Sequence, residues 1–218
     1  TAAWLDECGD RLPAPVGLAA GREALASLDL DRACELAAGT TDEEPLAGNL
    51  LLGEVRRLQA RAAEAEEALA IVADLATDDE TIVRVAMWRS TLQAHHADDP
   101  KGALALLEVA ADRVSSPERA FELRSEAAFL AGILGRFDVA VDTNRRILAT
   151  AELSDAARWT AMMNLLFGQV MMADLTAIDE PVNAMAGLMK EIGPTRPEGV
   201  DLYWALVTSV HTLRGELE

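Results

Sequence analysis

Four alanines and, in the last place, an isoleucine recur along this chain at a nearly constant interval. They follow one another at steps of 35, 35, 37 and 38 residues and are Ala33, Ala68, Ala103, Ala140 and Ile178. Each ends a short segment in which a turn leads into a helix. A repeat of this length is typical of helical hairpins stacked in an array. One hairpin is too short to bury a core of its own, so neighbouring hairpins must share one.

The composition favours helices over strands. Half of the residues are hydrophobic but only 4% are aromatic, and chains rich in alanine and leucine pack closely as helices. The formal net charge of −18 repels phosphate backbones and anionic lipid headgroups. We therefore expect an all-α protein with no direct nucleic-acid contact and no membrane contact. The acidity leaves two interpretations open, a solvated outer face or a docking surface for a basic partner.

The cysteines and the apolar stretches bear on the compartment. Cys8 and Cys34 lack the spacing of a metal site or a CxxC motif, which favours idle thiols in a reducing cytoplasm, and a bridge between them stays open. The longest apolar stretch, residues 161–175, is interrupted by polar residues and is too short to span a bilayer. We expect a cytoplasmic location.

Capping residues place the helices of the array. Ser116 stands before Pro117 and is suited to cap a first turn, and Gly135 tolerates the left-handed backbone that ends a helix. Pro181 is tolerated only in a first turn, so its helix must begin at residue 179 or 180. The predicted pairs are 16–28 with 31–38, 46–61 with 64–76, 80–96 with 100–114, 117–134 with 137–150, and 155–172 with 179–192, preceded by a partial helix at 4–12 and followed by a single helix at 198–214.

Two segments resemble known repeat proteins. Gly135-Arg-Phe-Asp-Val-Ala140 is similar to the turn signature of tetratricopeptide repeats, and residues 196–218 resemble the helical-repeat region of LuxR-type, maltose-regulator-like transcription activators of actinobacteria. The first resemblance implies tetratricopeptide-like hairpins stacked in a right-handed superhelical solenoid. We expect one domain over residues 1–218, with about five hairpins and an unpaired terminal helix.

The resemblance to the regulators also implies neighbouring domains and partners. Such activators carry an ATPase-like module before the repeats, a helix-turn-helix after them, and a protein or small-molecule inducer on the concave face. The sequence contains neither a phosphate-binding loop nor a basic recognition helix, and it stops in mid-repeat. We therefore expect a fragment of a longer protein.

Catalytic and metal chemistry have little support in the residue pattern. His95 and His96 are adjacent, so their side chains point about 100° apart on a helix and cannot easily share one ion. With Asp98 and Asp99 beside them, they are more typical of a polar helix end. His211 has no nucleophile or paired acid near it in sequence. We predict no enzyme activity, no catalytic residue, no metal and no cofactor.

Binding residues follow from the register that the tetratricopeptide resemblance supplies. In that register, five positions of each first helix line the concave face. The predicted set is Arg57, Arg61, Trp88, Leu92, His95, His96, Glu122, Phe129, Met163, Phe167 and Met171. Trp88 and His95 share a helix face and are the preferred contact pair, although Trp88 filling a gap between hairpins is the alternative. The methionines at 162, 163, 171 and 172 suit a core or an adaptable groove.

Aromatics, methionines and a few polar groups on one face predict a groove for a peptide, a helix or a small ligand. The sequence leaves open the ligand, the oligomeric state and the surface that binds. We expect a non-enzymatic recognition and regulatory module of a larger transcription regulator. The alternative is a constitutive protein–protein assembly scaffold with no sensory role.

Overall fold

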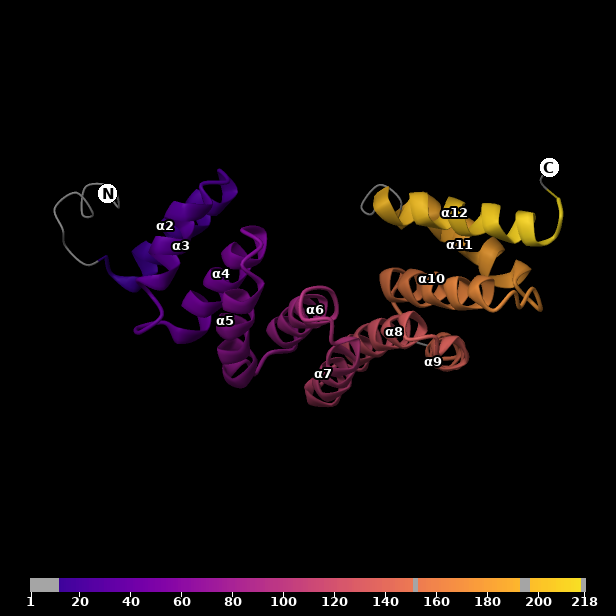
Figure 1. Ribbon diagram of the computed structural model, residues 1–218, viewed down its shortest axis with the longest axis horizontal. Helices are drawn as coiled ribbons and strands as arrows, with labels where there is room; N and C mark the ends of the chain where they lie inside the picture. The colour runs from indigo at the N-terminus through magenta and orange to yellow at the C-terminus, as the bar shows by residue number, and fades with distance from the viewer. Residues whose placement is uncertain (1–11, 151–152, 193–196, 217–218) are drawn as a thin grey trace. The chain divides into compact units, whose positions relative to one another are not determined.

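The computed structural model describes residues 12–150, 153–192 and 197–216, and within these residues every regular element is a helix (Figure 1). The predicted helices between residues 16 and 214 are all present, and the partial helix predicted at 4–12 lies almost entirely outside the described residues. The helices are α2 (Ala14–Ala26), α3 (Leu30–Ala38), α4 (Pro45–Leu58), α5 (Ala62–Leu75), α6 (Asp79–His95), α7 (Pro100–Arg113), α8 (Pro117–Ile133), α9 (Phe137–Leu148), α10 (Asp155–Met171), α11 (Asp179–Ile192) and α12 (Pro197–Leu213).

The helices belong to two compact units, each with its own internal packing. The N-unit, Thr1–Asp99, contains α2 to α6, and the C-unit, Pro100–Glu218, contains α7 to α12. Within each unit, consecutive helices from α2 to α6 and from α7 to α11 pack against one another, α2 packs on α4, and α10 packs on both α8 and α12. The boundary falls between the two helices of the predicted third hairpin. One continuous array over residues 1–218 stays a prediction, because each unit is defined by its own contacts.

Side-chain caps explain where several helices begin. The Ser116 hydroxyl accepts a hydrogen bond from the Arg119 backbone N–H, and Ser154 does the same for Ala157, as the sequence predicts. Asp78 caps α6 by accepting from the Thr81 backbone N–H at 2.8 Å. These bonds satisfy amides that have no partner inside the helix. The later start predicted for α11 is confirmed, because Pro181 lies in its first turn.

The turns inside the hairpins share one backbone feature. Each contains a residue with a positive φ, and these are Leu28 (61°), Ala60 (58°), Asp98 (52°), Gly135 (79°) and Ala173 (52°). This left-handed conformation exposes helix carbonyls to capping bonds from the next residues. Only one of the five positions is glycine, so four turns hold a side-chain-bearing residue where glycine is preferred.

This shared turn corrects the register of the second hairpin. In four turns, the residue five positions after the left-handed one belongs to the periodic set Ala33, Ala103, Ala140 and Ile178. In the second turn, five positions after Ala60 lies Ala65. A Cβ added at Gly53 would lie 3.6 Å from the Ala65 carbonyl oxygen. In the first hairpin, a Cβ added at Gly21 would lie 3.8 Å from the Ala33 carbonyl oxygen, so Ala65 is the equivalent of Ala33. The periodic residue of the second hairpin is therefore Ala65, and the predicted Ala68 is wrong by three residues. Both alanines are buried one helical turn apart, so hydrophobicity alone does not separate them.

The core of each unit lies between neighbouring hairpins as well as within them. In the N-unit, Leu51, Leu52 and Val55 of α4 pack on the buried alanines of α3, and Leu69 and Val72 of α5 pack on α6. In the C-unit a larger cluster around Leu166 joins α10 to α12. Small residues at the helix contacts let the backbones approach closely.

Candidate functional site

The predicted binding residues fall in both units. Those in the N-unit are Arg57, Arg61, Trp88, Leu92, His95 and His96. Those in the C-unit are Glu122, Phe129, Met163, Phe167 and Met171. We therefore describe two candidate surfaces, one for each unit.

In the N-unit, Trp88 is the centre of a contact between α4 and α6. The Arg57 guanidinium lies 5.1 Å from the centroid of the Trp88 ring, a cation–π geometry. Trp88 is half-buried and packs against the core cluster of α5 and α6. The indole therefore fills space between hairpins and offers only part of its surface to a ligand.

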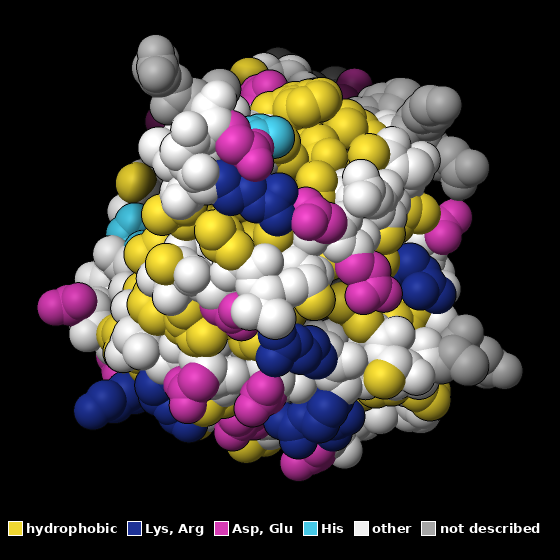
Figure 2. Space-filling view, turned by 90° about the vertical axis from the view of Figure 1, so that its right-hand side faces the viewer, with side chains coloured by type: hydrophobic (Ala, Val, Ile, Leu, Met, Phe, Trp, Pro, Cys, Tyr) yellow, Lys and Arg dark blue, Asp and Glu magenta, His cyan; other side chains and the backbone are white. Residues whose placement is uncertain are grey.

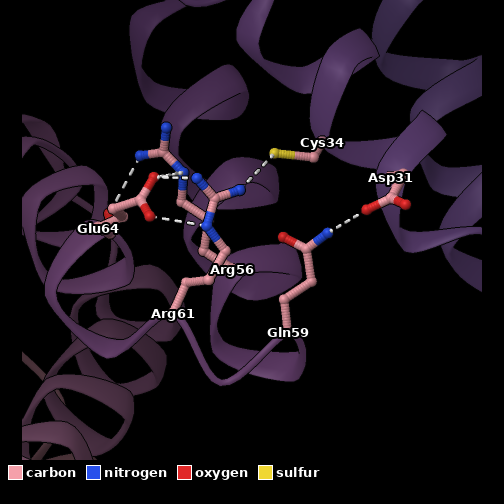
Figure 3. A network of polar contacts seen from close by, with 6 residues as sticks. All are labelled: Asp31, Cys34, Arg56, Gln59, Arg61 and Glu64. Atoms are coloured by element: carbon pink, nitrogen blue, oxygen red, sulfur yellow. Dashed lines mark hydrogen bonds and ion pairs between the residues drawn. The ribbon is translucent and has the colours of Figure 1, made fainter.

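Arg61 does not belong to the first-helix face. Helix α4 ends at Leu58 rather than at residue 61, and Arg61 is the N-cap residue of α5. Its guanidinium donates to the Glu64 carboxylate and lies 4.0 Å from the Cys34 sulfur (Figure 3). The predicted groove position was wrong because the second hairpin was read three residues out of register.

A network of polar contacts joins α3, α4 and α5 around Arg61 (Figure 3). Arg56 donates to the Glu64 backbone carbonyl at 3.1 Å, and Gln59 donates to the Asp31 carboxylate at 2.9 Å. Cys34 is a free, half-buried thiol, while Cys8 lies outside the described residues. The Gln59–Asp31 bond and the Arg61–Cys34 contact connect the first two hairpins, while Arg56 binds within the second.

The remaining N-unit residues lie at the last turns of α6. Leu92 is 4% exposed and belongs to the core, so it does not line an open face as predicted. His95 and His96 are exposed. Beside them lies a cavity of 320 Å³ between α5 and α6, which Leu92 and His96 line together with Glu66 and Gln93. The sequence analysis missed Glu66 and Gln93, because their proximity depends on how α5 packs against α6.

In the C-unit, three phenylalanine rings connect α8, α9 and α10. The ring centroids of Phe129 and Phe167 are 5.5 Å apart, and those of Phe137 and Phe167 are 6.3 Å apart. One turn beyond the two first-helix rings lie Ile133 and Met171, which are 49% and 53% exposed. We call Phe129, Ile133, Phe167 and Met171 the apolar strip. The face of the molecule shown in Figure 2 carries hydrophobic patches between separate acidic and basic side chains.

A buried polar network fixes the helices beneath the strip. The Ser125 hydroxyl donates to Asn144 Oδ1 at 2.8 Å and accepts from Asn164 Nδ2 at 2.9 Å, while Asn144 Nδ2 donates to the Ala140 carbonyl. The three side chains come from α8, α9 and α10 and satisfy one another. Such a network holds its helices in one register, because any slip leaves buried polar groups without partners.

The other C-unit residues predicted to bind have different environments. Met163 is 6% exposed and packs in the core, which corrects its place in the predicted groove. Glu122 is half-buried and accepts from Arg119 at 2.8 Å. Beyond Met171, the Asp174 carboxylate accepts from the Thr176 backbone N–H at 3.0 Å, which holds the pKa of Asp174 below its ordinary value. The turn after the strip is thereby fixed.

Two other kinds of site are not found in the described part of the chain. No group of three or more His, Cys, Asp or Glu residues there is arranged to hold a metal ion. No helix there is long and apolar enough to cross a bilayer.

Solved structures show what this arrangement is similar to. YrrB, a tetratricopeptide-repeat protein with an unusual peptide-binding site, is 14% identical over 87% of this chain and 92% of its own, with a TM-score of 0.58. MamA is 12% identical over 83% and 94%, with a TM-score of 0.61. The fold is that of tetratricopeptide repeats. A tetratricopeptide-repeat protein of Parabacteroides merdae is also similar, at 16% identity over 94% of this chain and 80% of its own, with a TM-score of 0.62.

The comparisons support the fold and nothing narrower. The all-α arrangement of tetratricopeptide-like hairpins predicted from the sequence is confirmed. No family model and no curated protein matches the chain. The resemblance to LuxR-type activators therefore has no support beyond the residues that suggested it.

Proposed function

We propose that this chain is a protein-interaction module that binds an apolar peptide segment of a partner along the apolar strip of the C-unit. The observation that carries the proposal is that exposed apolar side chains lie next to aromatic rings that are held by contact with each other. Ile133 and Met171 are about half exposed, while the rings one turn before them contact each other at 5.5 Å. Rigid aromatics beside a flexible methionine suit a surface that binds apolar side chains.

The strip favours a protein over a small molecule as its ligand. Its residues lie one helical turn apart on two first helices, which repeats an apolar contact at intervals that an amphipathic peptide helix or an extended chain can match. The underlying network of Ser125, Asn144 and Asn164 keeps α8 and α10 in place before a partner arrives. A preformed face loses less conformational entropy on binding.

Selection of peptides on the full chain tests the proposal. A random peptide library is selected on the wild-type protein, and the affinity of the enriched peptides is measured by fluorescence anisotropy. Met171→Glu places a charge in the strip and is expected to weaken binding by about tenfold or more, because a carboxylate must be desolvated against the apolar ligand.

The neighbouring methionine supplies the matched control. Met172 is 41% exposed, but it follows Met171 at the end of α10 and points away by about a quarter turn. Met172→Glu should leave the affinity within about twofold of wild type. Peptides that bind Met171→Glu as tightly as the wild-type protein would place the site elsewhere.

Our narrower proposal is that partner binding regulates a transcription factor, and it rests on the resemblance to LuxR-type activators. A reporter controlled by the full-length parent protein should lose its partner-dependent response with Met171→Glu and retain it with Met172→Glu. The assembly scaffold remains the competing proposal. It predicts self-association of the chain in sedimentation velocity and equal reporter output from both variants.

A further inference from the structure

Helix α12 ends in the same turn as α8 and α10. The φ angle is 70° at Gly215, 79° at Gly135 and 52° at Ala173. In each of the three turns, the N–H of this left-handed residue donates to the carbonyl three positions earlier, and the next N–H donates to the carbonyl five positions before itself. Because the backbone is the same, positions counted back from the three left-handed residues are equivalent.

Two positions before each of these left-handed residues lies an apolar side chain that is about half exposed. Ile133 is 49% exposed, Met171 53% and Leu213 46%. Their helices pack in sequence within the C-unit, α8 on α10 and α10 on α12 (Figure 1). We call Ile133, Met171 and Leu213 the apolar row. It continues the apolar strip by one helix, through a leucine that the sequence analysis did not name.

The apolar surface narrows on α12. Six positions before the left-handed residue, α8 has Phe129 and α10 has Phe167, whereas α12 has the half-buried Ser209. The Ser209 hydroxyl donates to the Ala205 carbonyl of its own helix. An α-helix with its side chains is about 10–12 Å wide and needs a broad apolar face, so one row of single side chains suits an extended chain better.

The spacing of the row selects among extended conformations. Packed helices lie about 8–10 Å apart. A polyproline II chain has three residues per turn and rises about 3.1 Å per residue, so every third side chain returns to the same face after about 9.3 Å. A β-strand returns a side chain to the same face after about 6.6 Å or about 13 Å. Of the two, only polyproline II places one side chain on each helix.

Charge and area narrow the choice of ligand. The row is uncharged, although the C-unit carries eleven Lys or Arg and seventeen Asp or Glu, so a ligand charge placed on it would lose water without gaining a partner. Three half-exposed side chains of this size offer on the order of 200 Å², against roughly 800 Å² that each partner buries in a stable protein complex. The row therefore suits a short segment rather than a second copy of this chain.

We propose that the apolar row binds a short segment of a partner protein in the polyproline II conformation, with an uncharged apolar side chain at every third position. Each of these side chains contacts one helix, and the third contact is Leu213. The inference rests on the proposed function, because it takes the apolar strip as the partner-binding surface. Prolines between the apolar residues fix the ligand backbone in advance and reduce the entropy lost on binding.

Fluorescence anisotropy with designed peptides on the full chain tests the pattern. The probe is a fluorescein-labelled peptide of three Leu-Pro-Ser repeats. One control has the same residues with the leucines at every second position, and the other is an alanine-rich helical peptide with leucines at every seventh position, about 10 Å apart. The probe should bind at least about tenfold more tightly than either control. Equal or weaker binding of the probe, or none, would overturn the proposal.

Variants of α12 test the third contact. Leu213→Glu should weaken binding of the probe about tenfold, because the carboxylate loses water against an apolar side chain. Leu213→Met keeps an apolar side chain and should stay within about twofold of wild type. Trp204 is 53% exposed and lies nine positions before Leu213, on the opposite side of α12. Trp204→Glu is therefore the matched control, and a loss equal to that of Leu213→Glu would overturn the third contact.

A peptide of two Leu-Pro-Ser repeats separates this inference from the proposed function. It needs only Ile133 and Met171, so its affinity for Leu213→Glu should be within about twofold of wild type, which also shows that the variant is folded. An equal loss for the two-repeat and three-repeat peptides would overturn the row. If Met171→Glu weakens binding of the selected peptides but Leu213→Glu does not weaken binding of the probe, the row is wrong and the proposed function stands. If neither variant weakens any peptide, both are wrong.

Discussion

The N-unit and the C-unit place different side chains at equivalent positions of the same hairpin. Six residues before the left-handed residue of the turn, the N-unit has Arg22, Glu54 and Leu92, whereas the C-unit has Phe129 and Phe167. Two positions before the left-handed residue, the N-unit has Ala26, Leu58 and His96, and the C-unit has Ile133 and Met171. The N-unit has a net charge of −12, from eight arginines against twenty acids, and the C-unit −6, from eleven Lys or Arg against seventeen acids.

This difference shows that the hairpin geometry and the side chains of the first helices depend on different residues. The turns and the small residues five positions after them keep the hairpin geometry in both units. The first-helix positions differ in burial, from Leu92 at 4% exposed to Ile133 and Met171 at 49% and 53%. One fold therefore carries different side chains at these positions in its two units.

The largest expected effect tests whether the two units unfold separately. Leu166 is fully buried in the C-unit, as Leu69 is in the N-unit, and replacing either by alanine should cost about 3 kcal/mol. Hydrogen exchange should show that Leu166→Ala lowers protection in α8 to α10 but not in α3 to α5, with the reverse for Leu69→Ala. Equal loss of protection in both units with either variant would mean one cooperative array.

The second prediction compares buried asparagines in the two units. Asn144 bonds to Ser125 of another helix, whereas Asn49 donates only to the Pro45 carbonyl of its own helix. Asn144→Ala should lower the free energy of unfolding of the C-unit by about 2 kcal/mol, because it strands the Ser125 hydroxyl. Asn49→Ala should lower that of the N-unit by about 0.5 kcal/mol. If urea denaturation shows similar losses of unfolding free energy for the two variants, the Ser125–Asn144–Asn164 network does not add stability beyond a bond within one helix.

The third prediction uses the left-handed turns that both units share. Ala60 in the N-unit and Ala173 in the C-unit have φ of 58° and 52°, a region that is unfavourable for a residue with a Cβ. Ala60→Gly and Ala173→Gly should each stabilise their unit by about 0.5 to 1 kcal/mol. Gly135→Ala should destabilise the C-unit by a similar amount. Thermal unfolding gives the sign of each change, and destabilisation by both glycine variants would contradict the turn geometry.

The smallest effect concerns pH. The hydrogen bond from the Thr81 backbone N–H holds the pKa of Asp78 below its ordinary value. Its stabilisation is therefore present above the ordinary carboxyl range and is lost as the pH falls through the lowered pKa. Ser154 caps α10 without a titrating group. Asp78→Ser should reduce the loss of stability of the N-unit in acid, followed by circular dichroism, and an unchanged acid profile would count against this cap.

The helices were predictable because local signals define them. Ser116, Ser154 and Gly135 cap or end helices through contacts within a few residues, so the sequence contains what is needed. The register of the second hairpin was not predictable, because Ala65 and Ala68 are both buried on one face of α5. Only the left-handed Ala60 distinguishes them, and alanine gives no sign of that conformation.

The candidate site was predictable only in part. Phe129 and Phe167 are in contact and Met171 is exposed on the same helix as Phe167, which fits the register predicted for the fourth and fifth hairpins, and their role in binding stays a proposal. Leu92 and Met163 occupy first-helix positions, but their side chains are buried in the core. The tilt between neighbouring helices decides which first-helix side chains the next hairpin covers. The lining of the α5–α6 cavity depends on tertiary packing in the same way.

A chemical-shift map of the full chain with one of the selected peptides tests the central claim most directly. If the apolar strip is the partner-binding surface, the shifts should centre on the amides of α8 around Phe129 and of α10 around Phe167, with the N-unit unchanged. Shifts centred on the N-unit, or on α9 and α11 without α8 and α10, would contradict the account.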